Sequence, residues 1–233
     1  MVRFTDRERL RVVTLDRPER RNALRPEDLD ALEAAVTGAD AADVPVVYLH
    51  GEGPAFCAGA DLDVVASLSD PEAFARHGQR VANAIETADC VVVAGIDGAV
   101  RGGGVELALA CDLRVATPEA TFAEPGVRFG LFGAWGGTVR LPRVMREGDA
   151  LDFALSGRAI DAEEALRTGL VSRIEEEPLA VAERLAANEP DALAAVKARM
   201  RDRRGRDAQE AAEAEAFGDL VRAHAADIAA DRG

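Results

Sequence analysis

Two glycine-marked turns, each preceded by an apolar run, constrain the fold of this chain most strongly. The first turn is the segment 56–61 (FCAGAD), which follows the apolar run 44–49, and the second is 101–106 (RGGGVE), which follows the run 90–96. Glycine has no Cβ and accepts positive φ, so the backbone at such turns can come close to another group. Two such turns side by side would aim two backbone N–H groups at one point, which is the arrangement that stabilises an oxyanion.

The apolar runs 44–49 and 90–96 predict buried strands, and the second turn is predicted to open a helix over 105–112. Residues 1–16 predict two short strands joined by a tight turn. Pro26 predicts the start of a helix, because its missing N–H costs nothing at the first helical position. Further short strands are expected at 114–116, 121–123 and 171–174, and further helices over 63–88 and from 139 onward.

Size and charge limit the kinds of partner that the chain can have. At 233 residues, with 48% of them hydrophobic, it is long enough for one large domain with an appendage. Its formal net charge is −14, from 42 acidic and 28 basic residues, and Lys197 is its single lysine. An acidic surface repels phosphates, which argues against a nucleic-acid partner. The acidic excess also suggests a protein kept soluble in high salt, where charge repulsion is screened.

The sequence also indicates a location and a redox state. The amino-terminal residues are charged rather than apolar, so we expect no signal peptide and a cytoplasmic protein. No apolar run approaches the length of a membrane span, so we expect no membrane association. Three widely spaced cysteines, Cys57, Cys90 and Cys111, predict free buried thiols. The three histidines lack paired spacing, so we expect no metal centre.

The composition shifts towards the end of the chain, which becomes rich in Ala, Glu, Asp and Arg and poor in glycine. The apolar spacing predicts helices over about 179–188, 190–203 and 207–229. These helices carry too few apolar residues to form a core of their own, so we expect them to pack on a neighbouring subunit. The chain thus divides into a core over 1–175 and a helical region over 176–233.

Several motifs stand in order along the chain. They are 17–24 (RPERRNAL), 56–62 (FCAGADL), 98–106 with 111–112, 136–138 (GGT), and 156–158 with 169–171. Together these segments resemble the enoyl-CoA hydratase/isomerase (crotonase) family, in register over residues 8–175. The resemblance implies an α/β fold, a crotonase-like spiral of strand–strand–helix units. It also implies that the helical region over 176–233 assembles a homotrimer or a dimer of trimers.

The resemblance implies an acyl-CoA thioester as the ligand and no separate cofactor, because coenzyme A is part of the substrate. It implies that the backbone N–H groups of Ala60 and Gly103 hold the thioester oxygen. An enolate places negative charge on that oxygen, and each preformed donor contributes about 3 kcal/mol. Gly103 would lie at a helix N-terminus, where the dipole favours an anion. The glycines alone are explained equally by tight turns, but two turns in this order favour the binding role.

The loop 17–24 resembles the segment that lies along the coenzyme A nucleotide. Arg20 or Arg21 would pair with a phosphate, for which the planar guanidinium is suited, although each also fits a solvated surface arginine. The resemblance adds three further binding residues, Ala23, Ala58 and Asp61. The backbone of Ala58 would meet the adenine, whereas Asp61 would serve equally well as the N-cap of the following helix.

Hydratases of this family use two glutamates, which position a water and move its proton. Glu106, three residues after Gly103, matches the first, and its alternative role is a favourable charge at a helix N-terminus. The second glutamate position is Gly126 here, which we place among the substrate-binding positions, so the chain departs from the two-glutamate pattern. Glu124 would point the same way in an extended segment. It could substitute, but we expect it to be a supporting or surface carboxylate.

A second departure concerns the acyl pocket. Trp135, the single tryptophan, replaces a small residue of the family motif. Together with Phe132 it is expected to line the pocket and exclude water, although core packing explains the tryptophan equally well. The tail lacks a basic terminal segment that often contacts coenzyme A in the family. Part of the phosphate clamp is therefore expected to be absent, or to come from Lys197 or from a neighbouring subunit.

We therefore expect an acyl-CoA enzyme, with enoyl-CoA hydratase as the leading activity. The alternatives are an enoyl-CoA isomerase or decarboxylase that uses Glu106 alone, and a non-catalytic acyl-CoA-binding protein, which Gly126 and Trp135 would favour. A dinucleotide-binding oxidoreductase is weaker, because the glycine spacing is not Gly-x-Gly-x-x-Gly. A hydrolase with Cys57 or Ser67 as nucleophile lacks an adjacent histidine.

Overall fold

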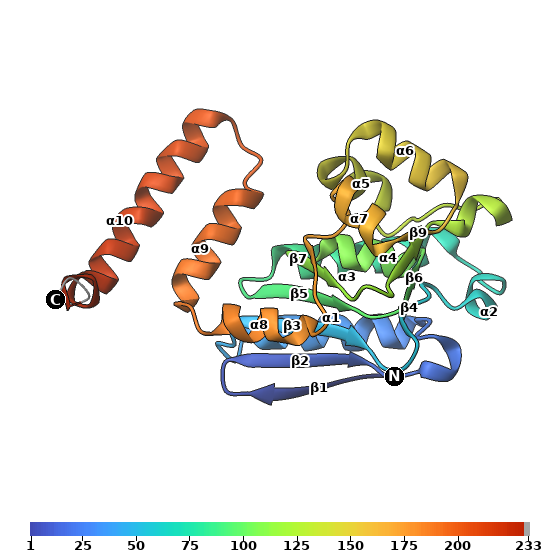
Figure 1. Ribbon diagram of the computed structural model, residues 1–233, viewed down its shortest axis with the longest axis horizontal. Helices are drawn as coiled ribbons and strands as arrows, with labels where there is room; N and C mark the ends of the chain where they lie inside the picture. Colours follow the sequence, from blue (N-terminus) through green and yellow to red (C-terminus); the bar gives the residue numbers. More distant parts are fainter. Residues whose placement is uncertain (231–233) are drawn as a thin grey trace.

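The computed structural model describes residues 1–230 and holds a larger and a smaller sheet (Figure 1). The strands of the six-stranded sheet, in spatial order, are β1 (Val2–Arg7), β2 (Leu10–Leu15), β3 (Val46–Gly51), β5 (Val91–Ile96), β7 (Leu113–Ala116) and β10 (Arg173–Ile174). Those of the four-stranded sheet are β4 (Ala55–Cys57), β6 (Ala99–Arg101), β8 (Thr121–Ala123) and β9 (Ile160–Asp161). The strands predicted at the amino terminus and over the two apolar runs are confirmed, but the turns directly follow the short strands β4 and β6, which the sequence did not predict.

From β3 to β8, consecutive strands go alternately to the two sheets. β3, β5 and β7 lie in the larger sheet, and the strand that follows each of them, β4, β6 or β8, lies in the smaller one. Within each sheet the neighbours pair in parallel, β3 with β5 and β4 with β6. Parallel neighbours need long crossover connections, and here each crossover contains a strand of the other sheet or a helix. The outcome is the expected α/β spiral of strand–strand–helix units.

Helices fill the connections and the end of the chain. They are α1 (Pro26–Asp40), α2 (Leu62–Val65), α3 (Pro71–Thr87), α4 (Gly103–Ala110), α5 (Gly137–Val144), α6 (Glu147–Ser156), α7 (Ala162–Thr168), α8 (Pro178–Ala186), α9 (Pro190–Arg201) and α10 (Arg206–Ala230). Two short 3-10 helices, η1 (Pro18–Arg20) and η2 (Pro125–Phe129), lie between them. Pro26 opens α1 as predicted. The helix predicted from residue 105 begins at Gly103 instead, because Gly102, with a φ of 50°, makes the turn.

The central strands β3 and β5 of the larger sheet are buried on both faces, which explains why they form continuous apolar runs, whereas the edge strand β1 is largely exposed. One face contributes Val47, Leu49 and Val92 to a core shared with α1, α3 and α4. The opposite face contributes Val46 and Tyr48 to a second cluster that includes residues of α8. The sequence assigned all of 176–233 to a peripheral region, whereas α8 is part of the core. Helix α9 packs on the second cluster through Leu193 and buries Lys197, whereas α10 has no buried residue.

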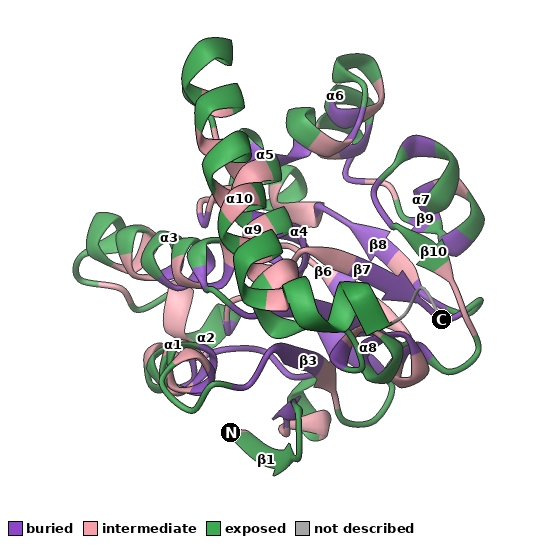
Figure 2. Ribbon diagram, turned by 90° about the vertical axis from the view of Figure 1, so that its left-hand side faces the viewer, coloured by how far each residue is buried: buried purple, intermediate pink, exposed green. Residues whose placement is uncertain are grey.

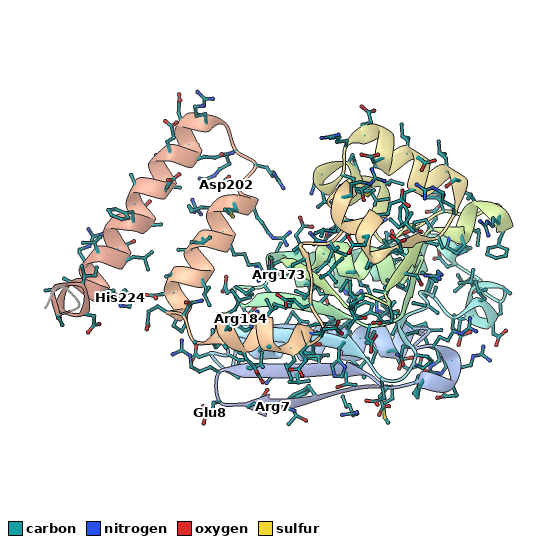
Figure 3. All side chains as sticks on the ribbon, viewed as in Figure 1. Arg7, Glu8, Arg173, Arg184, Asp202 and His224 are labelled. Carbon is teal, nitrogen blue, oxygen red and sulfur yellow. The ribbon has the colours of Figure 1, made fainter. Side chains whose placement is uncertain are left out.

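Helices α9 and α10 form an arm that projects from the body of the protein (Figure 1). Asp202 lies at the bend between them and His224 near the far end of α10 (Figure 3). None of the 25 residues of α10 is buried, and its surface is exposed or intermediate along its length (Figure 2). Among the described residues, no helix combines the length and apolarity that crossing a bilayer requires.

Buried ion pairs fasten α9 to the end of α4. The Lys197 ammonium donates to the Cys90 carbonyl at 2.7 Å and lies 2.9 Å from an Asp112 carboxylate oxygen. The Arg201 guanidinium donates to the same carboxylate at 2.7 Å. Lys197 is therefore an internal anchor of the arm, and the expectation that it helps to clamp a phosphate is wrong.

Replacing Asp112 by asparagine is expected to lower the free energy of unfolding by about 3 kcal/mol or more, because Lys197 would stay buried without its counter-charge. The control is Asp152→Asn, which breaks an exposed ion pair with Arg158 and should change stability by less than about 0.5 kcal/mol. Urea unfolding at one protein concentration measures both. Equal losses in the two variants would contradict the anchoring role of Asp112.

Candidate active site

The two glycine turns meet at the edge of the smaller sheet. They follow β4 and β6, which pair in parallel through Cys57 and Val100 and so release both turns at the same end. A Cβ added to Gly59 would lie 2.7 Å from the Gly103 nitrogen, so the contact requires glycine. The expectation that these turns lie side by side is confirmed.

The contact leaves two half-buried backbone N–H groups without a protein acceptor. Within residues 1–230, neither the Ala60 nor the Gly103 N–H donates a hydrogen bond, although the neighbouring amides do. The Asp61 N–H donates to the Leu24 carbonyl at 2.9 Å. Gly103 is the first residue of α4, where amides have no partner inside the helix and the helix dipole favours an anion. The pair is suited to bind a negatively charged oxygen.

Glu106 lies one turn further along α4 and is 1% exposed. Its Oε1 accepts hydrogen bonds from the Trp135 N–H at 2.8 Å and the Gly137 N–H at 2.6 Å. Among the described residues no hydrogen bond reaches Oε2, so this oxygen is available to a ligand. Burial raises the pKa of Glu106 to about 7, against the opposing effect of the two N–H donors. A carboxyl of this kind can take or give a proton near neutrality.

Trp135 is buried between α3 and α4. A Cβ on Gly78 would lie 2.1 Å from the indole Cδ1, and one on Gly103 would lie 2.4 Å from its Cζ3. Phe74 packs edge-on at 5.8 Å between ring centroids. The sequence left a pocket wall and core packing as alternatives, and the indole, which is 3% exposed, belongs to the core cluster; its role in a pocket wall stays a prediction. The indole is part of the core and also lies against Gly103 in the second glycine turn.

Glu124, which follows β8, is 6% exposed, so the expectation of a surface carboxylate is wrong. Its Oε1 is buried and has no hydrogen-bond partner in the described part of the chain. It lines a cavity of about 30 Å³ together with Phe132, whose ring is otherwise exposed. At Gly126, by contrast, a Cβ would lie 3.1 Å from the Leu131 carbonyl oxygen, against the backbone of the next segment.

The predicted coenzyme A loop is held against the first turn by charge. Asp61 is 2% exposed, accepts from the Asp63 N–H as the N-cap of α2, and lies 2.7 Å from the Arg17 guanidinium. Arg20 also pairs with Asp61, at 3.2 Å, and with Asp63. The side chain of Arg21 is exposed and makes no ion pair within residues 1–230.

Two backbone contacts complete this loop. The Ala58 N–H donates to the Arg21 carbonyl at 2.9 Å. The Ala23 carbonyl accepts from Arg17 at 3.2 Å. Thus Ala23, Ala58 and Asp61 lie together, but through contacts of the chain with itself. The sequence reasoning missed Arg17, which carries the pairing with Asp61, and Gly78, whose position inside a predicted helix signals a close approach.

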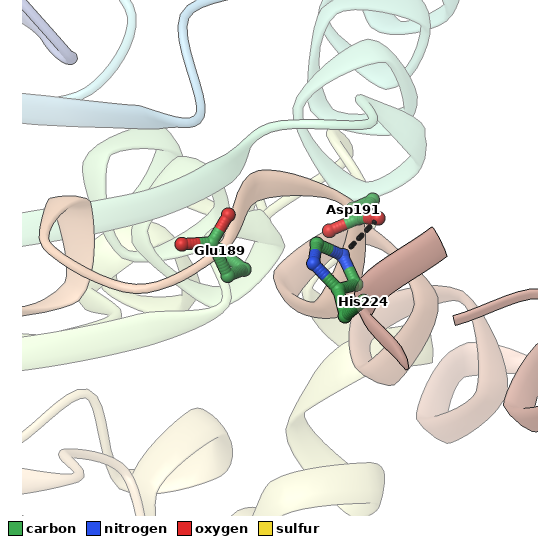
Figure 4. Close-up of side chains that lie close together, drawn as sticks. All are labelled: Glu189, Asp191 and His224. Atoms are coloured by element: carbon green, nitrogen blue, oxygen red, sulfur yellow. Dashed lines mark hydrogen bonds and ion pairs between the residues drawn. The ribbon is translucent and has the colours of Figure 1, made fainter. Parts of the chain in front are cut away.

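Glu189, Asp191 and His224 form one group of potential metal ligands in the described residues, with ligand atoms within 4.8 Å of one another (Figure 4). The His224 Nε2 is 2.7 Å from an Asp191 carboxylate oxygen, a hydrogen bond that ties α10 to α9. That bond accounts for the proximity of the group, which lies on the surface and far along the chain from the glycine turns.

Comparison with known proteins identifies the family. A sequence model described as enoyl-CoA hydratase/isomerase matches residues 5–226. The chain belongs to this family. A crotonyl-CoA hydratase of Syntrophomonas wolfei is 39% identical over 171 residues, which cover 72% of this chain and 66% of that protein. The chain thus matches about two thirds of the length of such curated relatives, down to 65% for a mycobacterial one.

Solved structures of other family members share the fold over nearly the whole chain. An enoyl-CoA hydratase from Thermoplasma volcanium superimposes with a TM-score of 0.89 at 29% identity, covering 95% of this chain and 92% of that one. One from Polaromonas superimposes with a TM-score of 0.88 at 30% identity, covering 94% of this chain and 91% of that one.

Replacing Gly78 by alanine is expected to destabilise this family member by about 1–3 kcal/mol, because the new methyl group would overlap the indole of Trp135. The fluorescence of this single tryptophan should shift as its packing changes. The control is Gly148→Ala on α6, where a Cβ meets nothing within 4 Å and the helix gains up to about 1 kcal/mol. Identical stability and emission in the two variants would show that the indole is not seated against α3.

Proposed function

We propose that this protein is an enoyl-CoA hydratase that acts on a 2-enoyl-CoA thioester. The observation that carries the proposal is the pair of unpaired N–H groups at Ala60 and Gly103, one helical turn from Glu106. Relatives that are named enoyl-CoA hydratase or crotonyl-CoA hydratase support hydration as the reaction. The thioester oxygen would accept from both amides, and the charge that develops on it in the enolate would be stabilised by about 3 kcal/mol per donor.

Glu106 would act as the base that takes a proton from water while the water oxygen bonds to the β-carbon. Its raised pKa places it near the operating pH, where a general base is most effective. Its fixed hydrogen bonds to Trp135 and Gly137 hold the carboxyl in one orientation. The indole beside Gly103 would border the reacting carbons and keep other water away.

Coenzyme A would lie along the loop 17–24. Arg20 already pairs with Asp61 and Asp63, whereas Arg21 is exposed and unengaged in the described residues. We therefore assign the phosphate contact to Arg21. The protein is expected to be cytoplasmic, because its three cysteines are all free and buried, as in a reducing compartment.

Isomerisation of the double bond is the second candidate, because Gly126 stands where the second glutamate is expected. A single carboxylate can move a proton between two carbons without water. A 3-enoyl-CoA offered to the protein separates the two activities: conversion to the 2-enoyl isomer without a 3-hydroxyacyl product would favour isomerisation.

Replacing Glu106 by glutamine is expected to lower kcat for hydration of crotonyl-CoA by about 10²- to 10⁴-fold, because the amide cannot accept a proton. Binding of butyryl-CoA should be unchanged, since the oxyanion donors remain. The wild-type rate should rise with pH through about 7 as Glu106 ionises. Absorbance of the conjugated thioester measures the rate, and isothermal calorimetry the binding. A glutamine variant with wild-type kcat would sink this assignment.

The same substitution should change the pH dependence of stability. The pKa of Glu106 is raised from 4.5 to about 7 in the folded protein, so its stabilising contribution is complete below pH 4.5 and lost as pH rises through 7. The glutamine variant does not ionise, so its melting temperature should exceed that of the wild type at pH 8 and match it at pH 4.5. A constant difference across this range would contradict the buried position of the carboxyl.

We further propose that α9 and α10 assemble the protein into a homotrimer or a dimer of trimers. An isolated helix with no buried residue is marginal in water, so a 25-residue helix of this kind needs a partner surface. Phe217, Val221 and Ile228 are exposed on it and would supply the apolar contacts.

The double variant Phe217→Asp/Val221→Asp should therefore reduce the mass in solution to that of the 24.6 kDa monomer. Light scattering after size-exclusion chromatography measures it. The control is Leu155→Asp, which changes an equally exposed apolar residue on α6 and should leave the mass unchanged. A monomeric wild type would overturn the proposal.

A further inference from the structure

Glu124 has an unusual position for a carboxyl group. Its Oε1 is buried and has no hydrogen-bond partner in the described residues. A buried polar atom without a partner is costly, and native proteins satisfy nearly all of them with protein groups or water. The group therefore needs an explanation, and no contact of the chain with itself supplies one.

The chain places Glu124 beside the oxyanion turn. Glu124 directly follows β8, and β8 pairs with β6 through Ala123 and Arg101. One residue beyond this pair, the Gly102 N–H donates a hydrogen bond to the Ala123 carbonyl at 3.1 Å, so β8 also contacts the start of the second glycine turn. The carboxyl thus follows the one strand that holds the turn carrying Gly103. Position 126, two residues further on, faces the backbone of Leu131 instead.

A small cavity joins Glu124 to the neighbourhood of Glu106. Glu124, Gly133 and Gly137 all line a cavity of about 30 Å³, which is large enough to hold a water molecule. The same two glycines pack against the other carboxyl. A Cβ on Gly133 would lie 2.8 Å from the Glu106 carboxyl carbon, and one on Gly137 would lie 2.9 Å from its Oε1. These two glycines therefore lie both on the wall of the cavity and against Glu106.

No cation offsets the charge of Glu124 in this cavity. The other lining side chains are Val127, Phe132, Thr138, Leu141 and Ala154, none of which titrates. Burial and, after it, the negative charge of Glu106 raise the pKa of Glu124 to about 8. The pKa of Glu106 is about 7. Around neutral pH the pair therefore divides into an acid, Glu124, and a base, Glu106, as neighbouring carboxyls in different environments do.

We propose that Glu124 is the second proton-transferring carboxyl of this site and gives its proton to the α-carbon of the acyl-CoA substrate. This proposal rests on the hydratase function proposed above. Glu106 takes a proton from water as the water oxygen bonds to the β-carbon, and the electron pair of the double bond moves to the thioester oxygen. The enolate then returns its electron pair to the α-carbon, which takes the proton of Glu124. Glu106 now holds the proton taken from water and Glu124 has lost its own. Transfer of that proton from Glu106 to Glu124 returns both carboxyls to their starting states.

Two reactions separate the roles of the carboxyls. Hydration of crotonyl-CoA needs both. Exchange of the α-protons of butyryl-CoA for solvent deuterium, followed by mass spectrometry, needs the oxyanion donors and the carboxyl that serves the α-carbon. Glu124→Gln should lose about 10²- to 10³-fold in both reactions with KM within a few-fold of the wild type. Glu106→Gln should lose hydration but keep exchange.

The matched control is Glu119→Gln, the same chemical change at an exposed position shortly before Glu124, which should leave both rates unchanged. The pH profile adds a readout that a structural role would not move. The wild-type rate of hydration should fall above pH 8 as Glu124 loses the proton it donates, and this fall should be absent from the residual hydration rate of Glu124→Gln. Glu124→Asp, which keeps the carboxyl but withdraws it, should lose at least about tenfold in kcat with its fold intact.

The outcomes separate this proposal from the function on which it rests. Wild-type rates of hydration and exchange in Glu124→Gln would overturn the role of Glu124 and leave the hydratase assignment standing. If Glu124→Gln does not fold, a wild-type kcat in Glu124→Asp overturns it in the same way. A wild-type protein that neither hydrates crotonyl-CoA nor exchanges butyryl-CoA would overturn the hydratase function itself.

Discussion

The close approach of the two glycine turns is the contact on which the rest of the site depends. Gly59 has a φ of 88°, and a side chain there would meet the Gly103 nitrogen at 2.7 Å and the Arg101 carbonyl oxygen at 2.8 Å. The approach leaves the amides of Ala60 and Gly103 unpaired and close together. The spiral serves this contact, because it sends two successive strands of the smaller sheet to the same edge in parallel.

The second constraint is that a carboxyl must be buried beside those amides. Glu106 accepts two backbone N–H groups from the segment that covers it, and burial still raises its pKa. Gly133 and Gly137 have no side chains, so the covering backbone can lie directly on the carboxyl. Burial of this carboxyl therefore costs some folding free energy at neutral pH, and it gives the group a pKa of about 7, which suits the base proposed above. A fully solvated glutamate would not destabilise the fold, but its lower pKa would leave it charged at neutral pH, so it would take up a proton only weakly.

Local chemistry explains what the sequence could predict. Apolar runs indicated the central strands, Pro26 marked a helix start, and the glycines of both turns marked the close approach. The features that the sequence did not predict depend on contacts between residues far apart in the chain. An extended segment would have pointed Glu124 the same way as position 126, but residues 125–129 form the 3-10 helix η2, so position 126 faces Leu131 while Glu124 lines a cavity formed with residues of 132–138. Likewise, no local pattern shows that Arg20 finds Asp61 or that the indole of Trp135 lies on Gly78, because each pair joins separate elements.

Helix α4 links the site to the arm. Its first residue, Gly103, presents an amide to the oxyanion position, and its C-terminal end is held from α9. The Arg201 guanidinium donates to the Ala110 carbonyl at 3.1 Å, which is among the carbonyls that the end of a helix leaves unpaired. A cation at this end complements the helix dipole, just as an anion does at the other. Since the arm is also the surface proposed for assembly, packing of α9 and α10 on another subunit would fix the same helix that carries Glu106. The position of the base and the state of assembly therefore share one rigid element.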